Sequence, residues 1–447
     1  MTPSRLTTAA CLAVTLSVAA PAQDPGTDRR KALDEATRDL RPPSTELGSA
    51  RVGDTTFRLL DVSLNILGAI GTSTERDASL QTLQGGAHDP RKRGFTLQQA
   101  ELGLKGAVDP YFNAEAYIIH SIDPIEGEST TELEEAFLST TSLPFGLQVE
   151  AGTFFTEFGR INSRHPHQWH FVDQPIVASR MFGGDGMRGP GARVGWLLPT
   201  DFFAELHFGV QNANGETMAS FLANDELFEE RPIGGRAFAD REVRSLQDLV
   251  YLARLDTGFD VGDATSMKFG VSGLIGPNAT GDDGRTVIYG ADFVWKWRPP
   301  ENDKGWPFVV FESEVIARRY RAAEQVDASD PLNPVTLPRT TLDDYGFYAQ
   351  LIYGFAPRWA AGLRGEYVSG RGASYDATTQ TFAGRSGDAF RDDRLRISPL
   401  LAHHPTEFSR LRLQYSFDDA DRLDGGDAHS VWLGFEVLFG RHPAHAY

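Results

Sequence analysis

Apolar and polar residues alternate along most of the chain from residue 55 onward. In DVSLNILGAI, Val62, Leu64 and Ile66 share one face of an extended segment, and Ser63 and Asn65 share the other. The same period of two recurs in AELGLKGAV, YFNAEAYI, FSRLRLQYSF and SVWLGFEVLF. A period of two is typical of β-strands whose two faces meet different surroundings. The pattern therefore predicts an all-β chain.

About sixteen segments show this alternation, each near the length that a tilted strand needs to cross a bilayer. The predicted strands are 56–70, 95–108, 111–121, 132–142, 146–156, 187–198, 202–211, 247–259, 265–276, 285–297, 307–320, 342–355, 358–370, 391–401, 406–417 and 428–440. An even number fits bacterial barrels, in which both termini lie on the periplasmic side.

The connections between these segments alternate in length. Short ones include Asp109-Pro110, Ala356-Pro357 and His403-His404-Pro405. Long polar ones lie at 71–94, 157–186, 212–246, 321–341 and 371–390. Short periplasmic turns and long external loops are typical of transmembrane barrels. We therefore predict a transmembrane antiparallel β-barrel of about sixteen strands over residues 55–440.

A soluble, secreted all-β protein is the alternative. One face of each strand would then form a core, but the opposite face is too charged to be buried cheaply. The apolar face also carries aromatic residues near strand ends, such as Trp196, Trp295 and Phe439. Aromatic girdles of this kind mark the edges of a membrane. The pattern favours the membrane barrel.

The regions outside the barrel have their own signatures. Residues 1–22 resemble an export signal, with Arg5, a short apolar run and the A-x-A site Ala20-Pro21-Ala22. Residues 23–54 are expected to form a periplasmic extension with a possible short helix, and 441–447 a histidine-containing periplasmic tail. Export and barrel together predict an outer-membrane location, in contact with outer-membrane lipid.

Charge and cysteine usage narrow the picture further. The formal net charge is −18 and the pI is about 5.1, which argues against a nucleic-acid partner. The one cysteine, Cys11, lies in the predicted signal, so the mature chain is expected to lack disulfides. The last predicted strand resembles the signal read by the outer-membrane barrel-assembly machinery. Its residues are Gly434, Phe435, Val437 and Phe439.

Two resemblances follow. The architecture resembles the general and phosphate-selective porins. The block from EEAFLSTTSLPFG to RVGWLLP, residues 134–199, is similar to a family of Gram-negative outer-membrane proteins described as porin-like or as zinc-regulated TonB-dependent receptors. The receptor description implies an N-terminal plug domain, and only a short polar segment precedes the first predicted strand. The resemblance implies an outer-membrane location and a barrel, and it says little about cargo. Because sixteen-stranded porins are commonly trimers, it also implies a possible homotrimer.

Alternation assigns charged residues to the inner face, where they would tune selectivity. The acidic set is Glu101, Glu115, Glu135 and Glu150. The basic set is Arg364, Arg394, Arg396, Arg410 and Arg412. Because the two signs fall on different arcs, we expect a field across the lumen. The alternative is that these charges only hydrate the pore and pair with one another.

The third long loop contains FGRINSRHPHQWHFVDQP. Its Gly, Pro and aromatic residues favour a constriction segment folded into the lumen over a free external loop. His165, His167, His170 and Asp173 offer ligands suited to Zn²⁺ or Cu²⁺. The alternative is that these side chains bond within the loop and fix its shape. No other cofactor is expected.

No G-x-S-x-G, P-loop or H-E-x-x-H motif occurs, so the chain is not expected to be an enzyme. The sequence predicts a porin for passive diffusion of small solutes or ions. The alternative is a non-conducting or metal-binding barrel, such as a metal-uptake receptor or a surface-binding protein.

Overall fold

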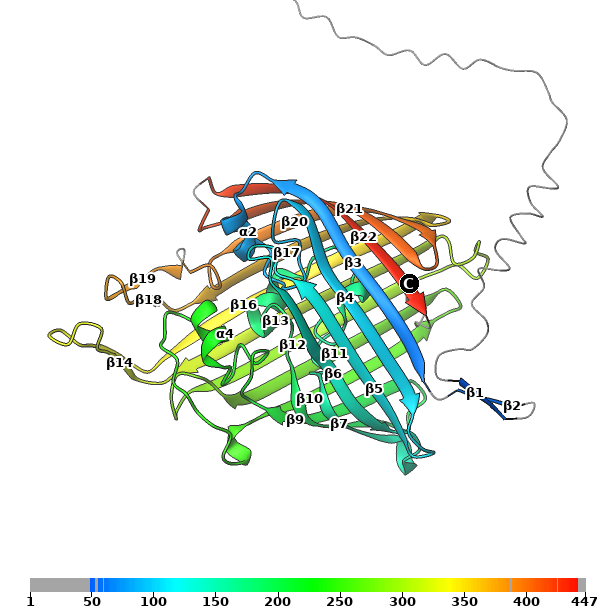
Figure 1. Ribbon diagram of the computed structural model, residues 1–447, viewed down its shortest axis with the longest axis horizontal. Helices are drawn as coiled ribbons and strands as arrows, with labels where there is room; N and C mark the ends of the chain where they lie inside the picture. The colour runs from blue at the N-terminus through cyan, green and yellow to red at the C-terminus, as the bar shows by residue number, and fades with distance from the viewer. Residues whose placement is uncertain (1–48, 53–54, 59, 386–387, 424, 441–447) are drawn as a thin grey trace, which may run out of the picture. The chain divides into compact units, whose positions relative to one another are not determined.

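Sixteen antiparallel strands close into one barrel in the computed structural model, which describes residues 49–52, 55–58, 60–385, 388–423 and 425–440. Figure 1 shows the tilted strands wrapping around the barrel. The first eight strands are β3 (Asp61–Ser73), β4 (Gly94–Ala107), β5 (Phe112–Ile122), β6 (Ser129–Thr140), β7 (Leu147–Phe155), β8 (Arg188–Leu197), β9 (Phe203–Asn212) and β10 (Leu249–Val261). The remaining eight are β11 (Thr265–Pro277), β12 (Arg285–Trp297), β13 (Phe308–Ala322), β16 (Thr340–Ala356), β17 (Trp359–Arg371), β20 (Arg394–Thr406), β21 (Ser409–Ala420) and β22 (Asp427–Gly440).

The chain runs up and down the wall in sequence order, and β22 pairs with β3 to close it. At this seam Leu433 lies opposite Ile70. Closure removes both edges of the barrel sheet, so every barrel strand has two hydrogen-bonding neighbours. The predicted number of strands is confirmed, and most predicted boundaries lie within three residues of the observed ones.

Two predicted boundaries were wrong. The first barrel strand begins at Asp61 rather than at residue 56, because Asp61 pairs with Lys105 and β4 ends two residues later. Thr55–Arg58 (β2) instead pair with Ser49–Val52 (β1) in a separate two-stranded sheet.

The other wrong boundary is the turn predicted at His403-His404-Pro405. These residues belong to β20, whose register with β21 shifts between His403 and Thr406. The turn follows at residues 407–408, where the hydroxyl groups of Thr406 and Ser409 are 2.8 Å apart. The predicted signal peptide, the possible short helix and the histidine-containing tail lie outside the described residues.

Long connections gather at one end of the barrel in Figure 1, where helices and hairpins follow the strands. They carry α2 (Asp77–Leu83), α4 (Asp225–Glu230) and the hairpins β14–β15 (Gln325–Asp327, Val335–Leu337) and β18–β19 (Ser374–Asp376, Thr381–Ala383). None of the helices in the described part of the chain is long and apolar enough to cross a membrane.

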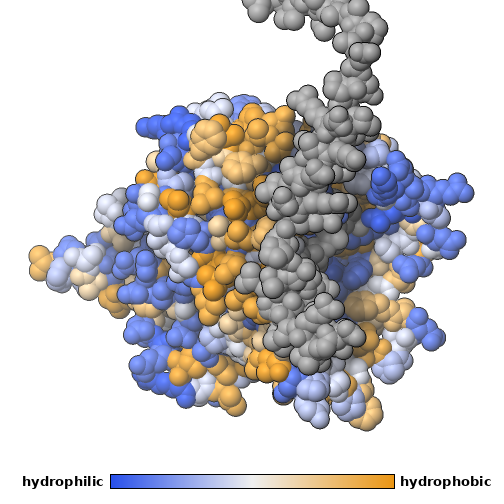
Figure 2. Space-filling model, turned by 45° about the vertical axis from the view of Figure 1, so that its right-hand side comes forward, coloured by the Kyte–Doolittle hydropathy of each residue, from blue (hydrophilic) through white to orange (hydrophobic). Residues whose placement is uncertain are grey.

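The outer wall is apolar. Leu363, Leu413 and Val437 are among many large hydrophobic side chains that lie 40–60% exposed on it. Figure 2 shows such residues gathered as a band on the wall, with hydrophilic residues toward both ends. The inner face has the opposite character, because many of its buried residues are charged. An apolar exterior around a polar interior is the arrangement of a barrel whose solvent is lipid.

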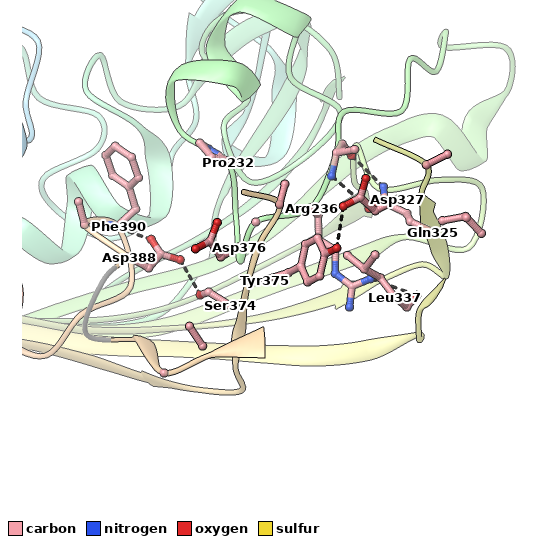
Figure 3. A pocket seen from close by; sticks show the side chains of 18 residues that line it. Pro232, Arg236, Gln325, Asp327, Leu337, Ser374, Tyr375, Asp376, Asp388 and Phe390 are labelled. Atoms are coloured by element: carbon pink, nitrogen blue, oxygen red, sulfur yellow. Dashed lines mark hydrogen bonds between the residues drawn. The ribbon is translucent and has the colours of Figure 1, made fainter. Parts of the chain in front are cut away.

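The three long connections 212–246, 321–341 and 371–390 enclose a cavity of about 670 Å³, shown in Figure 3. Tyr375 donates a hydrogen bond to Asp327 at 2.6 Å, and Arg236 donates one to the backbone oxygen of Pro338 at 2.9 Å. These bonds join the long loops to one another at this end of the barrel.

Candidate functional site

The third long loop, residues 157–186, lies inside the barrel and bonds to inward-facing side chains of strands all around it. It contains the helix α3 (Ile176–Phe182), which begins after Pro175 and ends before Gly183, where φ is 91°. All seven residues of α3 are buried. A surface loop would expose most of them, so this burial shows how completely the wall encloses the loop.

Apolar contacts hold one side of the loop against the wall. Val177 and Met181 of α3 belong to the same buried cluster as Ile316 on β13, Tyr348 on β16 and Val368 on β17. The backbone N–H of Ile176 donates a hydrogen bond to Glu366 on β17 at 2.6 Å. The helix is thus fixed by apolar packing along its length and by a wall carboxylate at its start.

Inward-facing glycines make room for this packing. A Cβ on Gly346 would approach Val177 to 3.1 Å, one on Gly290 would approach Phe158 to 3.1 Å, and one on Gly434 would approach Val172 to 2.6 Å. Strand glycines often mark a close approach of another segment. Here that segment is the inner loop. Gly434 therefore has a packing role in addition to its predicted place in the assembly signal, which stays a prediction.

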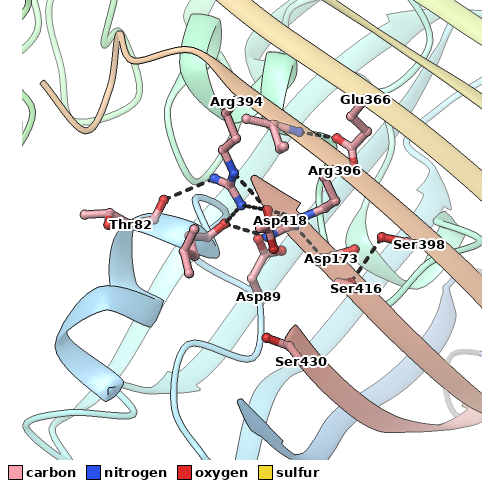
Figure 4. A network of polar contacts seen from close by, with 12 residues as sticks. Thr82, Asp89, Asp173, Glu366, Arg394, Arg396, Ser398, Ser416, Asp418 and Ser430 are labelled. Atoms are coloured by element: carbon pink, nitrogen blue, oxygen red, sulfur yellow. Dashed lines mark hydrogen bonds and ion pairs between the residues drawn. The ribbon is translucent and has the colours of Figure 1, made fainter. Parts of the chain in front are cut away.

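The predicted arginines all lie on the inner face and are 0–4% exposed. Arg364 and Arg396 both contact Asp173 of the loop, at 2.5 and 2.8 Å. Arg394 and Arg396 share Asp418, as Figure 4 shows. These charges are paired, because each guanidinium lies against a carboxylate of the wall or of the loop.

Two further arginines bind the backbone of the loop. Arg410 pairs with Glu436 at 2.5 Å and donates a hydrogen bond to the backbone oxygen of His167 at 2.7 Å. Arg412 donates to the backbone oxygens of Trp169 and Phe171 at 3.1 and 2.7 Å. The loop therefore satisfies its carbonyl groups with wall arginines where water would satisfy them on a surface.

The predicted acidic residues also face inward, but they have different partners. Glu115 pairs with Lys105 near the short-turn end, and Glu150 pairs with Arg193 at 3.0 Å. Glu101 and Glu135 instead contact histidines of the loop. The acidic set is thus divided between ordinary ion pairs and a carboxylate–imidazole cluster.

Glu134 also belongs to this cluster. It was not among the residues predicted from the sequence. It is 1% exposed although its neighbour Glu135 also faces inward. The register between β5 and β6 shifts at this point, since Tyr117 pairs with Glu135 and Ile118 with Leu133. Such a bulge turns two successive side chains to one face. A strict period of two places Glu134 on the lipid side, where a carboxylate is unfavourable. This unfavourable position is the feature of the sequence from which the bulge could have been predicted.

The four residues predicted as metal ligands do not converge. Burial opposes protonation of His165, but the charges of Glu101 and Glu134 outweigh it and hold its pKa well above the usual range. His170 lies outside this group of contacts. Burial lowers its pKa to about 3, although the charge of Glu312 acts to raise it. Asp173 forms ion pairs with Arg364 and Arg396. Only His165 and His167 come together, with stacked rings 5.5 Å apart.

The start of the loop is held by charges that the sequence reasoning did not single out. Arg160 bridges Asp256 on β10 and Asp292 on β12, at 2.5 and 2.6 Å. Arg164 pairs with Glu312 on β13 at 2.8 Å. Both arginines lie in the quoted loop motif, so their spacing of four residues was visible, but their partners were not.

Part of the inner face remains open to water. Its charged side chains are 11–26% exposed, and because they point inward this exposure is to the lumen. They are Glu150, Glu157, Arg160, Arg193, Glu205, His207 and Asp256. These residues lie on β7 to β10 and on the start of the loop. This partly exposed group, the open arc, borders the part of the lumen that the described inner loop leaves accessible.

Comparison with known proteins supports the architecture. No family model matches the chain. A protein of Aquifex aeolicus (strain VF5), described only as uncharacterized, is 31% identical over 419 residues, which are 87% of this chain and 80% of the relative. Among solved structures, Pseudomonas putida OprB has a TM-score of 0.52 at 12% identity and covers 85% of this chain and 94% of its own.

The outer membrane channel DcaP of Acinetobacter baumannii has the same TM-score at 10% identity, covering 85% of this chain and 97% of its own. These structural likenesses establish the fold, and the apolar belt independently requires a lipid environment. The chain is therefore a sixteen-stranded outer-membrane β-barrel that belongs to the same family as the uncharacterized Aquifex aeolicus protein.

Proposed function

We propose that this protein is an outer-membrane porin that lets small solutes or ions diffuse passively through a narrow, charged passage. The open arc carries the proposal. A barrel of this strand number has an aqueous lumen unless something fills it. The inner loop fills most of it, and the partly exposed charges of the open arc border the remaining water-accessible space.

The sign of these charges suggests a preference for cations. The open arc has four carboxylates, on Glu150, Glu157, Glu205 and Asp256, against two guanidinium groups, on Arg160 and Arg193. A passage lined by an excess of one sign favours the opposite ion. The buried arginines Arg364 to Arg412 are paired, so we propose that they hold the loop and contribute less to selectivity than the open arc.

The test is planar-bilayer recording with the purified, folded protein. We expect stable current steps and a reversal potential in a KCl gradient that shows cation preference. The double variant Glu150→Gln, Glu157→Gln leaves the charge of Arg193 uncompensated, so its reversal potential should shift toward anions. Glu242→Gln, on an exposed ion pair with Arg244, is the matched control and should record as wild type.

A closed barrel that binds a ligand is the second candidate, because most of the inner loop is buried. Absence of current steps from folded protein would favour this candidate over the porin. The particular porin type and the homotrimer implied by the resemblance remain predictions. Chemical cross-linking in native membranes would test the homotrimer by showing whether a three-chain species predominates.

A further inference from the structure

Three carboxylates and an imidazole meet inside the barrel, between the inner loop and the wall. The Nδ1 atom of His165 lies 3.2 Å from Oε2 of Glu101 on β4 and 2.9 Å from Oε2 of Glu134 on β6. Its Nε2 atom lies 3.0 Å from Glu135. All four residues are at least nine-tenths buried. This carboxylate–imidazole cluster belongs to neither the open arc nor the arginine-lined side of the lumen.

The carboxylates of the cluster lack the arginine partners that other carboxylates of the lumen have. Asp173 lies against two arginines, and Glu312 lies against Arg164. Among the described residues, no lysine or arginine forms an ion pair with Glu101, Glu134 or Glu135. Burying three carboxylates together is costly unless cations approach them closely. The positively ionisable groups within ion-pair distance of the three carboxylates are the imidazoles of His165 and of His167, which lies 3.2 Å from Glu101.

Hydrogen bonding leaves the centre of the cluster unsatisfied. Neither side-chain oxygen of Glu134 has a hydrogen bond of good geometry, and neither does Nδ1 of His165, although Oε2 of Glu134 lies only 2.9 Å from this nitrogen. Buried polar atoms in native proteins are rarely left in this state. Oε2 of Glu134 and Nδ1 of His165 approach one another, and Oε2 of Glu101 lies 3.2 Å from the same nitrogen, so one small cation could be bound by all three atoms.

The outer contacts orient the imidazole as metal sites do. Nε2 of His165 points to Glu135, whose other oxygen accepts a hydrogen bond from the backbone N–H of Phe155 at 2.8 Å. A histidine that ligates a metal commonly donates its second N–H to a carboxylate, which fixes the tautomer. In this arrangement Nδ1 carries the lone pair, and it faces Glu101 and Glu134.

We propose that Glu101, Glu134 and Nδ1 of His165 bind one divalent transition-metal cation of the Zn²⁺ class, with Glu135 as the residue that orients His165. Ligand atoms around tetrahedral zinc lie roughly 3.3 Å from one another, close to the 2.9 and 3.2 Å found here. The cation would join the loop to β4 and β6. The proposal does not depend on whether the barrel conducts.

A second grouping of possible ligands does not carry the same argument. His88, Glu132 and Asp185 also approach one another beside a cavity of about 400 Å³. There, however, Arg188 lies 3.1 Å from Glu132 and supplies the positive charge. In the carboxylate–imidazole cluster no described arginine forms an ion pair, although the charge of Arg188 also acts on Glu134. The cation is assigned to this cluster because its ligand atoms converge at 2.9 and 3.2 Å.

Zinc titration by calorimetry, on folded barrel stripped with a chelator, tests the proposal. Wild type should bind one Zn²⁺ per chain. Glu134→Gln keeps the shape but removes a ligand charge, so binding should weaken at least about a hundredfold, and Glu135→Gln should weaken it about 10- to 100-fold. His170→Ala, a histidine of the same loop outside the cluster, should bind as wild type.

Heat-modifiable gel mobility shows which variants are folded. Visible absorption of Co²⁺-loaded wild type gives a readout that needs no variant, since carboxylate–imidazole coordination produces bands that free Co²⁺ lacks. Wild type that binds neither ion would overturn the proposal and leave His165 as a protonated counter-ion only. Folded Glu134→Gln with wild-type affinity would also overturn it.

Discussion

At the scale of single residues, the inner face of this barrel is a set of buried charges whose partners come from the loop. Asp173 is the clearest case, since it accepts bonds from Arg364, Arg396 and Gln414 and is fully buried. A buried carboxylate between two arginines is sensitive to removal, because each arginine then loses a counter-charge in a medium of low dielectric constant.

Replacing this carboxylate should detach the centre of the loop from the wall. We expect Asp173→Ala to lower the free energy of unfolding by about 3–5 kcal/mol, the usual cost of breaking a buried pair. Glu242→Gln, on a surface pair that is about three-quarters exposed, should change it by less than about 1 kcal/mol. Urea unfolding followed by gel mobility measures both, and equal stabilities would refute the anchoring role.

Asp89 should make stability depend on pH. Burial, and then the charge of Asp173, raises the pKa of Asp89 to about 7, although two backbone N–H bonds act in the opposite direction. The folded state therefore favours the protonated acid more than the unfolded state does. Stability from this residue is present below its ordinary pKa of 3.8 and is lost as pH rises through about 7.

Asp89→Asn, which cannot ionise, should remove this part of the pH dependence. Between pH 5 and 8 we expect wild type to lose stability relative to the variant. Urea midpoints at several pH values measure the difference, with Glu242→Gln as the control that keeps the wild-type slope. A variant whose stability runs parallel to wild type over this range would show that Asp89 does not titrate there.

At the scale of elements, the loop 157–186 behaves as an internal segment of the barrel. It contributes α3 to an apolar cluster with β13, β16 and β17, and its polar backbone is bonded by arginines of β21. Strand glycines opposite Phe158, Val172 and Val177 leave space for it. The loop is thus held over its whole length, which is the property that a fixed constriction needs.

Deleting residues 163–172 should widen the passage. The deletion removes the histidines and the segment that crosses toward β4 and β6, while α3 and its apolar contacts stay. If the barrel conducts, single-channel conductance should rise. A matched deletion in the external hairpin, residues 328–334, should leave conductance near wild type. Unchanged conductance after the first deletion would place the permeation path away from this part of the loop.

At the scale of the whole molecule, the barrel separates two solvents. Large apolar side chains cover the outside, and paired charges, buried or partly exposed, cover the inside. Neighbouring positions on one strand therefore respond oppositely to the same substitution. On β21, Arg412 is fully buried inward, whereas Leu413 is 48% exposed outward.

A charge on the outer face should oppose membrane insertion. We expect Leu413→Arg to cost about 2–4 kcal/mol of folding free energy in lipid vesicles, the range for arginine near the bilayer midplane. Leu332→Arg, in an external loop where Leu332 is 89% exposed, should cost close to nothing. Folding titrations in urea with phospholipid vesicles measure both. Similar values would mean that Leu413 does not face lipid.

The sequence by itself determined the class, number and faces of the strands, because these depend on local patterns. The period of two shows which side chains share a face, and the lengths of the connections show how the strands follow one another. Sixteen strands and the inward direction of Arg364 or Glu101 could be read in this way. The start of β3 could not, since it depends on where β4 ends.

Only the tertiary structure decided which charges meet. Asp173 and Arg364 are 191 positions apart, and nothing in the local pattern pairs them, because any inward charge could serve any other. The bulge that turns Glu134 inward breaks the period on which sequence reasoning relies. Closure of the barrel then brings β4, β6 and the loop together, and His165 meets three carboxylates of the wall there. The spacing in the sequence had instead grouped His165 with His167, His170 and Asp173.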